Sequence, residues 1–360
     1  MPFRFNYIAT ILEENVSRLT RATIRDVAHA AGVSVGSASR ALNGGRNVSA
    51  RVIEEVAQAA KQLGYQPDFL ARSLRTRSSG MVGCLVSDIA NPLYAEIVQA
   101  AEGRLREAGC LLVVASTGND PKREQDAVAE FRGRRLDGVL VAPGSDTNEK
   151  SWRALAEAGT AVVILDRDPP SSDDGPFPSV LVDHRGGAVA ATRYLLGLGH
   201  RRIALLTPGA RMRPGRERIA GFRQAFADAG RSLDGALVCP QESSMDFAYS
   251  AALAVLEAPA RPTAVIALGT RILAGTLRAA RTLGLSIPED LSVVSVGDTD
   301  IAAVHTPAIT ALRWSLEDVG RAAAELLLQR LKGDGTTAPP RALLPVDLVL
   351  RESCAPPTRT

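Results

Sequence analysis

The chain lacks the features that mark membrane, secreted and metal-dependent proteins. No apolar run among its 360 residues approaches the roughly 18 residues that a membrane-spanning helix needs, and no short apolar core followed by a small-residue cleavage site opens it. The four cysteines are scattered without a C-x-x-C pair, and His29, His184 and His305 show no metal-ligand spacing. Gly-x-Ser-x-Gly and Walker motifs are also missing. These absences predict a soluble cytoplasmic protein that is not an enzyme and has no metal and no cofactor.

Positive charge is concentrated near the N-terminus. Residues 20–80 hold nine Lys and Arg residues against four Asp and Glu residues, although the net charge of the whole chain is only +3. A basic segment attached to a near-neutral body indicates a local surface for a polyanion. A solvated basic face is the alternative, and the helix pattern of the segment favours the polyanion surface.

The basic segment carries the pattern of two short helices that meet at a tight turn. Thr23 can cap the first helix, Gly32 allows the turn, and Ser34 can cap the second helix. Arg40 follows the small residues of the second helix and is long enough to reach a base edge or a phosphate. A third helix is expected between 49 and 64. The pattern predicts a helix-turn-helix unit, with a plain three-helix bundle as the alternative.

Short motifs at fixed order make the prediction specific. These motifs are Thr-Ile-Arg-Asp-Val-Ala from Thr23, Ala-Gly-Val-Ser from Ala31, Ser-Arg-Ala-Leu-Asn from Ser39, Val48-Ser49, Leu-Gly-Tyr-Gln-Pro from Leu63 and Ala-Arg-Ser-Leu from Ala71. With them, the chain resembles the LacI/GalR (lactose-repressor) family of bacterial transcription regulators, and the likeness extends over about residues 22–353.

The resemblance implies which residues of the helix-turn-helix domain, residues 23–66, contact DNA. Val35 offers only apolar contact, for example to a thymine methyl group, and Gly36 has no side chain. We therefore expect Arg40 to carry much of the major-groove specificity. The implied contact positions are Thr23, Ser34, Val35, Gly36, Ser37, Ser39, Arg40, Asn43 and Asn47.

Residues 67–80 would form the hinge helix and linker of the family. Pro67 suits the first position of a helix. By resemblance, Leu74 would insert between base pairs in the minor groove, one from each subunit, and Arg72 would lie on phosphate. Unstacking the bases costs a few kcal/mol, and the bent duplex that results is more widely contacted. The alternative is that Leu74 packs on the core.

The remainder of the chain alternates apolar runs with helical stretches, which is typical of parallel α/β sheets. The expected strands are 81–86, 110–116, 138–142, 161–166, 180–183, 202–207, 264–268, 292–296 and 343–350. The expected helices lie near 92–108, 121–134, 149–158, 185–198, 214–229, 247–257, 271–283 and 316–332. The fold class is therefore an N-terminal all-α helix-turn-helix headpiece with a hinge helix, followed by an α/β sensor of two doubly wound parallel-sheet subdomains.

The resemblance implies a periplasmic-binding-protein-like sensor over 81–353, which binds an effector and forms a dimer. Its first subdomain would comprise 81–180 and 312–342, and its second 183–311 and 344–352, before a tail over 354–360. Ligands of such folds bind at the carboxyl ends of the strands.

The expected effector site combines a guanidinium, a carboxylate and an aromatic ring, which suits a polyol or an anionic sugar acid. Where the family usually has Asn-Asp this chain has Gly269-Thr270, and where it usually has Asp-Asp this chain has Gly297-Asp298. Loss of these hydroxyl acceptors points to an anionic effector such as a sugar acid or sugar phosphate; a degenerate pocket without a ligand is the alternative. By resemblance to the family, the expected effector-binding residues are Asn91, Leu93, Tyr94, Asp166, Arg216, Phe247, Arg271 and Asp298.

Residues 1–22 form an N-terminal extension outside the resemblance, with the pattern of a short amphipathic helix; a flexible arm or a start codon annotated too early is the alternative. Two-fold symmetry demands a palindrome-like operator. No heptad-repeat helix follows the last strand, so a homodimer is expected rather than a coiled-coil tetramer. The expected function is a homodimeric DNA-binding regulator, a repressor, that a small effector controls. The competing class is a solute-binding module or an enzyme built on the same body, which would leave residues 23–80 without a purpose.

Overall fold

The computed structural model describes residues 22–42, 48–66, 78–142, 144, 149–168, 177–233, 237–241, 245–333 and 341–358. These residues belong to two compact units, Met1–Ser79 and Gly80–Thr360. Residues 1–21 of the N-terminal extension and residues 67–77 of the predicted hinge helix and linker lie outside the described residues, and so do Asn43, Asn47, Arg72 and Leu74. Within the described part of the chain, no helix is long and apolar enough to cross a bilayer.

The N-terminal unit consists, in its described part, of the three helices that the sequence predicts. They are α2 (Ile24–Ala30), α3 (Val35–Leu42) and α4 (Ala50–Gln62). Gly32 has a φ of +64°, the left-handed conformation that glycine adopts without strain, and so makes the tight turn between α2 and α3 possible. Small side chains in the core let the three helices approach closely. The buried apolar residues are Val27, Ala28, Ala38, Ala41, Val56, Ala59 and Ala60.

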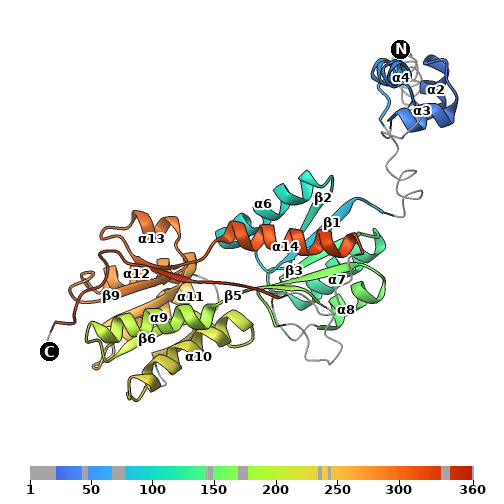
Figure 1. Ribbon diagram of the computed structural model, residues 1–360. Helices are drawn as coiled ribbons and strands as arrows, with labels where there is room; N and C mark the ends of the chain where they lie inside the picture. Colours follow the sequence, from blue (N-terminus) through green and yellow to red (C-terminus); the bar gives the residue numbers. More distant parts are fainter. Residues whose placement is uncertain are drawn as a thin grey trace, which may run out of the picture. The chain divides into compact units, whose positions relative to one another are not determined.

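The C-terminal unit contains two six-stranded sheets, and the first is entirely parallel (Figure 1). Its strand order is β11-β5-β4-β3-β1-β2. Helices α6 and α14 cover one face and α7 and α8 the other. The strands are β1 (Met81–Val86), β2 (Leu111–Ser116), β3 (Gly138–Ala142), β4 (Ala161–Leu165), β5 (Ser179–Val182) and β11 (Arg341–Leu344). The helices are α6 (Pro92–Glu107), α7 (Pro121–Gly133), α8 (Glu149–Glu157) and α14 (Leu316–Leu331).

The second sheet repeats this plan in the order β12-β10-β9-β8-β6-β7, and only its β10–β12 pair is antiparallel. Helices α9 and α10 pack on one face, and α11, α12 and α13 on the other. The strands are β6 (Ile203–Pro208), β7 (Val238–Gln241), β8 (Ala264–Leu268), β9 (Ser292–Val296), β10 (Thr310–Arg313) and β12 (Asp347–Val349). The helices are α9 (His184–Gly197), α10 (Arg213–Asp228), α11 (Met245–Leu256), α12 (Gly269–Thr282) and α13 (Asp300–Val304).

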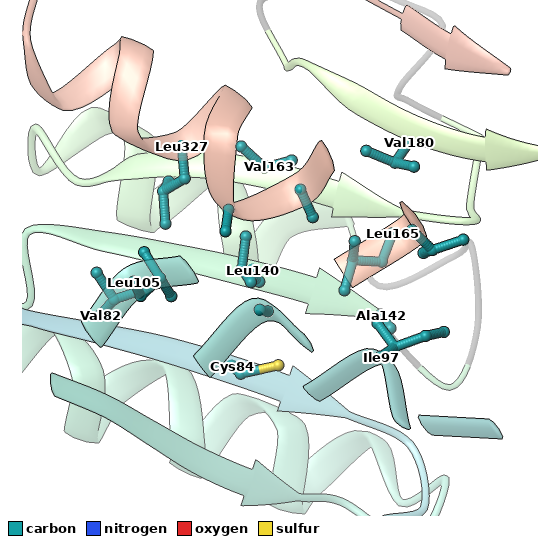
Figure 2. Close-up of a cluster of buried hydrophobic side chains, with 14 of the residues drawn as sticks. Val82, Cys84, Ile97, Leu105, Leu140, Ala142, Val163, Leu165, Val180 and Leu327 are labelled. Atoms are coloured by element: carbon teal, nitrogen blue, oxygen red, sulfur yellow. The ribbon is translucent and has the colours of Figure 1, made fainter. Parts of the chain in front are cut away.

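The central strands, among them β1, β3 and β9, bury side chains on both faces, which explains the continuous apolar runs in the sequence. Figure 2 shows one such layer, in which Leu105 of α6 and Leu327 of α14 lie over Val82, Leu140 and Val163 of the first sheet. Alternate residues of the same strands face α7 and α8. The chain passes between the sheets after β5, after β10 and between β11 and β12, and this places the carboxyl ends of both sets of parallel strands within one compact unit.

The structure differs from the sequence prediction at four elements. The expected strand over 343–350 is two strands, since β11 joins the first sheet and β12 the second. Strands β7 and β10 and helix α13 were not predicted. Each is only four or five residues long and too short for a clear periodicity. Its tertiary partners therefore determine its structure.

Candidate functional site

The exposed face of α3 carries the residues that the sequence predicts to read DNA. Ala38 and Ala41 point into the core, so Val35, Gly36 and Arg40 face outward, and Val35 keeps 44% of its surface exposed. An apolar side chain this exposed on a short helix is available for contact with a partner. The helix thus presents one apolar group and one cation on the same face.

Serine side chains organise the start of this helix. Ser37 donates its backbone N–H to Ser34 Oγ over 3.1 Å, and the two hydroxyls lie 2.9 Å apart. Arg40 Nη2 donates to Ser37 Oγ over 3.4 Å, and its Nη1 lies 3.8 Å from where a Cβ on Gly36 would be. The guanidinium of Arg40 therefore lies along the helix beside Gly36, at ordinary van der Waals distance from where a Cβ would be.

Thr23 is the N-cap residue of α2. Its backbone N–H and its hydroxyl both donate to Asp26 Oδ2, over 2.7 and 2.8 Å. The hydrogen bond from the backbone of Thr23 holds the pKa of Asp26 below its usual value. The hydroxyl that the sequence assigns to DNA contact is thus engaged within the helix cap.

A buried charge cluster lies where β4 ends, and Asp166 is its centre. The residue follows β4 directly with a φ of +50°, and its carboxylate receives three kinds of donor. Arg213 Nη1 at 3.1 Å and the backbone N–H of Val182 at 3.2 Å donate to Oδ1, while His184 Nε2 lies 2.7 Å from Oδ2. Burial alone would raise the pKa of Asp166, but His184 and the nearby arginines lower it below its ordinary value. Asp166 is therefore an ionised anchor between the two halves of the unit.

His184 is neutral because of what its two ring nitrogens face. Arg218 Nη2 lies 3.1 Å from Nδ1, and a guanidinium can only donate, so Nδ1 is the acceptor and Nε2 carries the proton toward Asp166. Burial lowers the pKa of His184 to about 4. Burial also lowers the pKa of Arg218 to about 10. Trp314 packs edge-on against the imidazole with ring centroids 5.5 Å apart.

Two more arginines connect this cluster to its surroundings. Arg167 donates from Nη2 to Tyr94 Oη over 3.0 Å and from Nη1 to the carbonyl oxygen of Asp166 over 2.9 Å. Arg216 Nη2 donates to Asp168 Oδ2, and Arg213 Nε lies 3.4 Å from the other oxygen of Asp168. The carboxylates come from the end of β4 and Arg213 and Arg216 from α10, so these ion pairs join the two halves.

A second contact between the halves involves the start of α6 and the start of α12. Arg271 Nη1 donates to Asp88 Oδ2 over 2.7 Å. A Cβ built on Gly269 would lie 4.0 Å from Leu93 Cδ1, and one on Gly297 would lie 3.8 Å from both methyl carbons of Leu93. Leu93 therefore lies next to the two glycines that replace polar residues of the family pattern.

The eight predicted effector residues are all described, and the contacts of each can be given. Tyr94, Asp166 and Arg216 belong to the charge cluster, and Leu93 lies next to the two glycines. The other four make local contacts or are exposed. Asn91 caps α6 by accepting the N–H of Leu93, Arg271 pairs with Asp88, Phe247 is exposed in the first turn of α11, and Asp298 pairs with Arg351 and Arg313 near β10.

Sequence reasoning missed His184, Arg213 and Arg218. Arg218 had a detectable signal, because it lies four and seven residues before Phe222 and Ala225, on the buried face of α10. An arginine on the apolar stripe of a helix needs a buried partner. Across the described residues, no group of three or more His, Cys, Asp and Glu side chains is arranged to hold a metal ion.

Each of the two units matches a known protein-family model. Residues 23–68 match the model of the bacterial regulatory proteins of the lacI family, and residues 192–354 match the periplasmic binding protein-like domain. The HTH-type transcriptional regulator DegA of Bacillus subtilis is 30% identical over 339 residues, which are 93% of this chain and 99% of DegA.

Solved structures extend the likeness to the whole fold. The transcriptional regulator CelR–cellobiose complex is 33% identical, with a TM-score of 0.70 over 92% of this chain and 100% of CelR. The lac repressor dimer bound to operator and the anti-inducer ONPF is 26% identical, with a TM-score of 0.82 over 93% of this chain and 100% of that one. The helix-turn-helix unit, the two sheets and the sequence motifs all match these relatives. The chain belongs to the LacI family of DNA-binding bacterial transcription regulators.

Proposed function

We propose that this protein is a repressor that binds a palindromic operator as a homodimer. A small effector raises or lowers its affinity for that operator. The observation that carries the proposal is the outward face of α3, where Val35, Gly36 and Arg40 stand clear of the headpiece core. A helix with this exposure, preceded by a tight turn, fits the major groove. Arg72 and Leu74 are proposed to act in the minor groove beside it.

Selection of random duplex DNA by the purified protein, at near-physiological salt, tests this function. Nonspecific binding to phosphate weakens steeply with salt, so enrichment there reports base reading. We expect an inverted repeat with a deformable central step. If no sequence is enriched, with or without candidate effectors, the proposed function is wrong.

Arg40→Ala tests the role of the recognition helix directly. Loss of a bidentate base contact costs about 1–3 kcal/mol per half-site and relaxes the sequence preference at one position. Arg51→Ala is a matched control, because Arg51 is an exposed arginine on α4 whose partner is Glu55. Fluorescence anisotropy on the selected operator and on single-base variants measures both. Equal loss on every sequence would show that Arg40 contacts phosphate alone.

The edge of the first sheet supports a homodimer. Strand β2 lies at that edge and exposes Leu111 and Val114, with 63% of Leu111 accessible. Exposed apolar side chains on an edge strand are a liability unless something covers them. We propose that the second subunit does so. In analytical ultracentrifugation, Leu111→Glu is expected to shift the protein toward monomer. The control Leu350→Glu changes an equally exposed leucine after β12 and should stay dimeric.

The effector is proposed to bind where the carboxyl ends of both sets of parallel strands meet, as is general for such folds. Sugars, sugar acids and sugar phosphates are the classes that the sequence suggests. The abundance of arginine around Asp166, with Arg213, Arg216 and Arg218 all contributed by α10, favours the anionic members of this set.

A further inference from the structure

Among the described residues, one side chain holds the guanidinium of Arg40. Arg40 Nη2 donates to Ser37 Oγ over 3.4 Å, and Arg40 has no other hydrogen-bond or ion-pair partner in the described part of the chain. Its Nη1 lies 3.8 Å from where a Cβ on Gly36 would be. Both distances show that the side chain runs back toward the amino end of α3, as long side chains on helices do. The cation therefore lies over the first turn of the helix.

This position is unfavourable for a cation on its own. The free backbone N–H groups of the first turn give the amino end of a helix a partial positive charge. The first turn of α3 holds no acidic residue that could offset it. The acceptors beside the guanidinium are hydroxyl groups, since Ser34 Oγ lies 3.9 Å from the same Cβ position on Gly36. The hydrogen bond to Ser37 thus keeps Arg40 in place against the field of the helix.

The two serine hydroxyls form a chain that ends on the guanidinium. Ser34 Oγ accepts the backbone N–H of Ser37 and lies 2.9 Å from Ser37 Oγ. Because Ser37 Oγ accepts from Arg40, the cooperative arrangement is the one in which Ser37 donates its single proton to Ser34. The proton of Ser34 then remains for a partner outside the helix. Ser37 has no proton left to donate to a phosphate oxygen.

We propose that Ser37 acts on DNA through Arg40, as a positioning residue that holds the guanidinium in one orientation before the operator binds. The inference rests on the proposed function, in which Arg40 contacts the operator, and it replaces the direct DNA contact that the resemblance implies for Ser37. One of the five N–H donors of Arg40 is used, so four remain for bases or phosphates. An arginine that is ordered beforehand loses less side-chain freedom on binding.

Ser37→Ala removes the hydroxyl without removing the helix cap. The backbone N–H that Ser34 accepts is retained, and alanine is the strongest helix former. Affinity for the selected operator is expected to fall about threefold to tenfold at each half-site. Ser37→Thr keeps a hydroxyl and should restore most of that affinity. Full affinity in Ser37→Ala would overturn the inference.

A double-mutant cycle shows whether Ser37 acts through Arg40. In the Arg40→Ala background, Ser37→Ala should have no further effect on operator affinity, measured by fluorescence anisotropy. Ser39→Ala is the matched control on the same helix. Residues adjacent in sequence do not face each other on a helix, so its effect should be the same with and without Arg40. If Ser37→Ala weakens binding equally in both backgrounds, Ser37 contacts DNA itself and the inference is wrong.

Nuclear magnetic resonance of the free full-length protein tests the positioning without DNA. The Nε–H signal that disappears in Arg40→Ala belongs to Arg40, and its relaxation reports motion of the guanidinium on the ps–ns timescale. Ser37→Ala should increase this motion, and Ser37→Thr should leave it unchanged. Equal motion in the wild type and Ser37→Ala would contradict the inference. A protein that selects no operator refutes the proposed function, whereas the relaxation measurement still decides whether Ser37 positions Arg40.

Discussion

Lowering the pH from 7 to 5 is expected to destabilise the sensor unit through His184. The imidazole is buried, with Arg218 at Nδ1 and Asp166 at Nε2, so the folded protein keeps it neutral. Burial places its pKa at about 4, against 6.5 in the unfolded chain. Because the unfolded state takes up the proton first, the contribution of His184 to stability is complete above pH 6.5 and is lost as the pH falls toward 4.

The size of the effect follows from these two pKa values. Between pH 7 and pH 5 the unfolded state gains most of one proton at this site while the folded state gains little. The corresponding loss in the free energy of unfolding is about 2 kcal/mol. His200 has a lowered pKa because of its own burial and contributes a slope of the same sign. A variant at position 184 is therefore needed to isolate this term.

His184→Gln supplies that comparison, because glutamine offers one donor and one acceptor and does not titrate. Urea unfolding at pH 7, 6 and 5, followed by tryptophan fluorescence, measures both proteins; Trp314 lies against the imidazole and reports locally. The wild type should lose about 2 kcal/mol more than His184→Gln between pH 7 and 5. Parallel stability profiles for the two proteins would refute the assignment of a neutral, buried His184.

Two other changes follow from the packing and charges of the same unit. Gly320→Ala should destabilise by about 1–3 kcal/mol because the new Cβ meets the carbonyl oxygen of Ile97, whereas Gly103→Ala on α6 meets nothing and should stabilise by about 0.5–1 kcal/mol; urea midpoints measure both, and equal effects would contradict the close α6–α14 packing. Asp166→Asn should cost about 3 kcal/mol by leaving buried arginines without a carboxylate, against at most about 1 kcal/mol for Asp228→Asn in an exposed pair. Similar losses for these two, measured by thermal unfolding, would show that the centre at Asp166 is not needed for stability.

The sequence was sufficient to predict those helices and strands that are marked by neighbouring residues, such as a helix cap or an apolar run. Ser49 caps α4 through its side chain, at the residue where the sequence places the start of the third helix. The core strands are runs buried on both faces, and β1, β3 and β8 begin and end where those runs do. The short strand β7 carries Pro240 and lies at a sheet edge, where pairing with β6 is what makes it a strand.

The candidate site was less predictable because its partners come from distant segments. Asp166 was expected from its place at a strand end, but its partners His184 and Arg213 lie 18 and 47 residues further along. No spacing rule connects such residues. Asp298 likewise pairs with Arg313 and Arg351, which lie 15 and 53 residues further along, and its predicted role in effector binding stays a prediction. The identity of a strand-end residue can be predicted, but its partner depends on how the two halves meet.

The contacts between the halves suggest which interaction an effector must use to change their arrangement. The pairs Arg271–Asp88 and Arg216–Asp168 are partly exposed, with side-chain exposures between 27% and 50%. Pairs of this kind contribute at most about 1 kcal/mol each, so they hold the halves together only weakly. A ligand shifts a conformational equilibrium only by its difference in affinity for the two states. The pair Arg213–Asp166 also joins the halves, and its side chains are only 10% and 21% exposed, so solvent screens it less than the two exposed pairs. The effector proposed above must therefore act on the contacts around Asp166 if it is to change the arrangement of the halves.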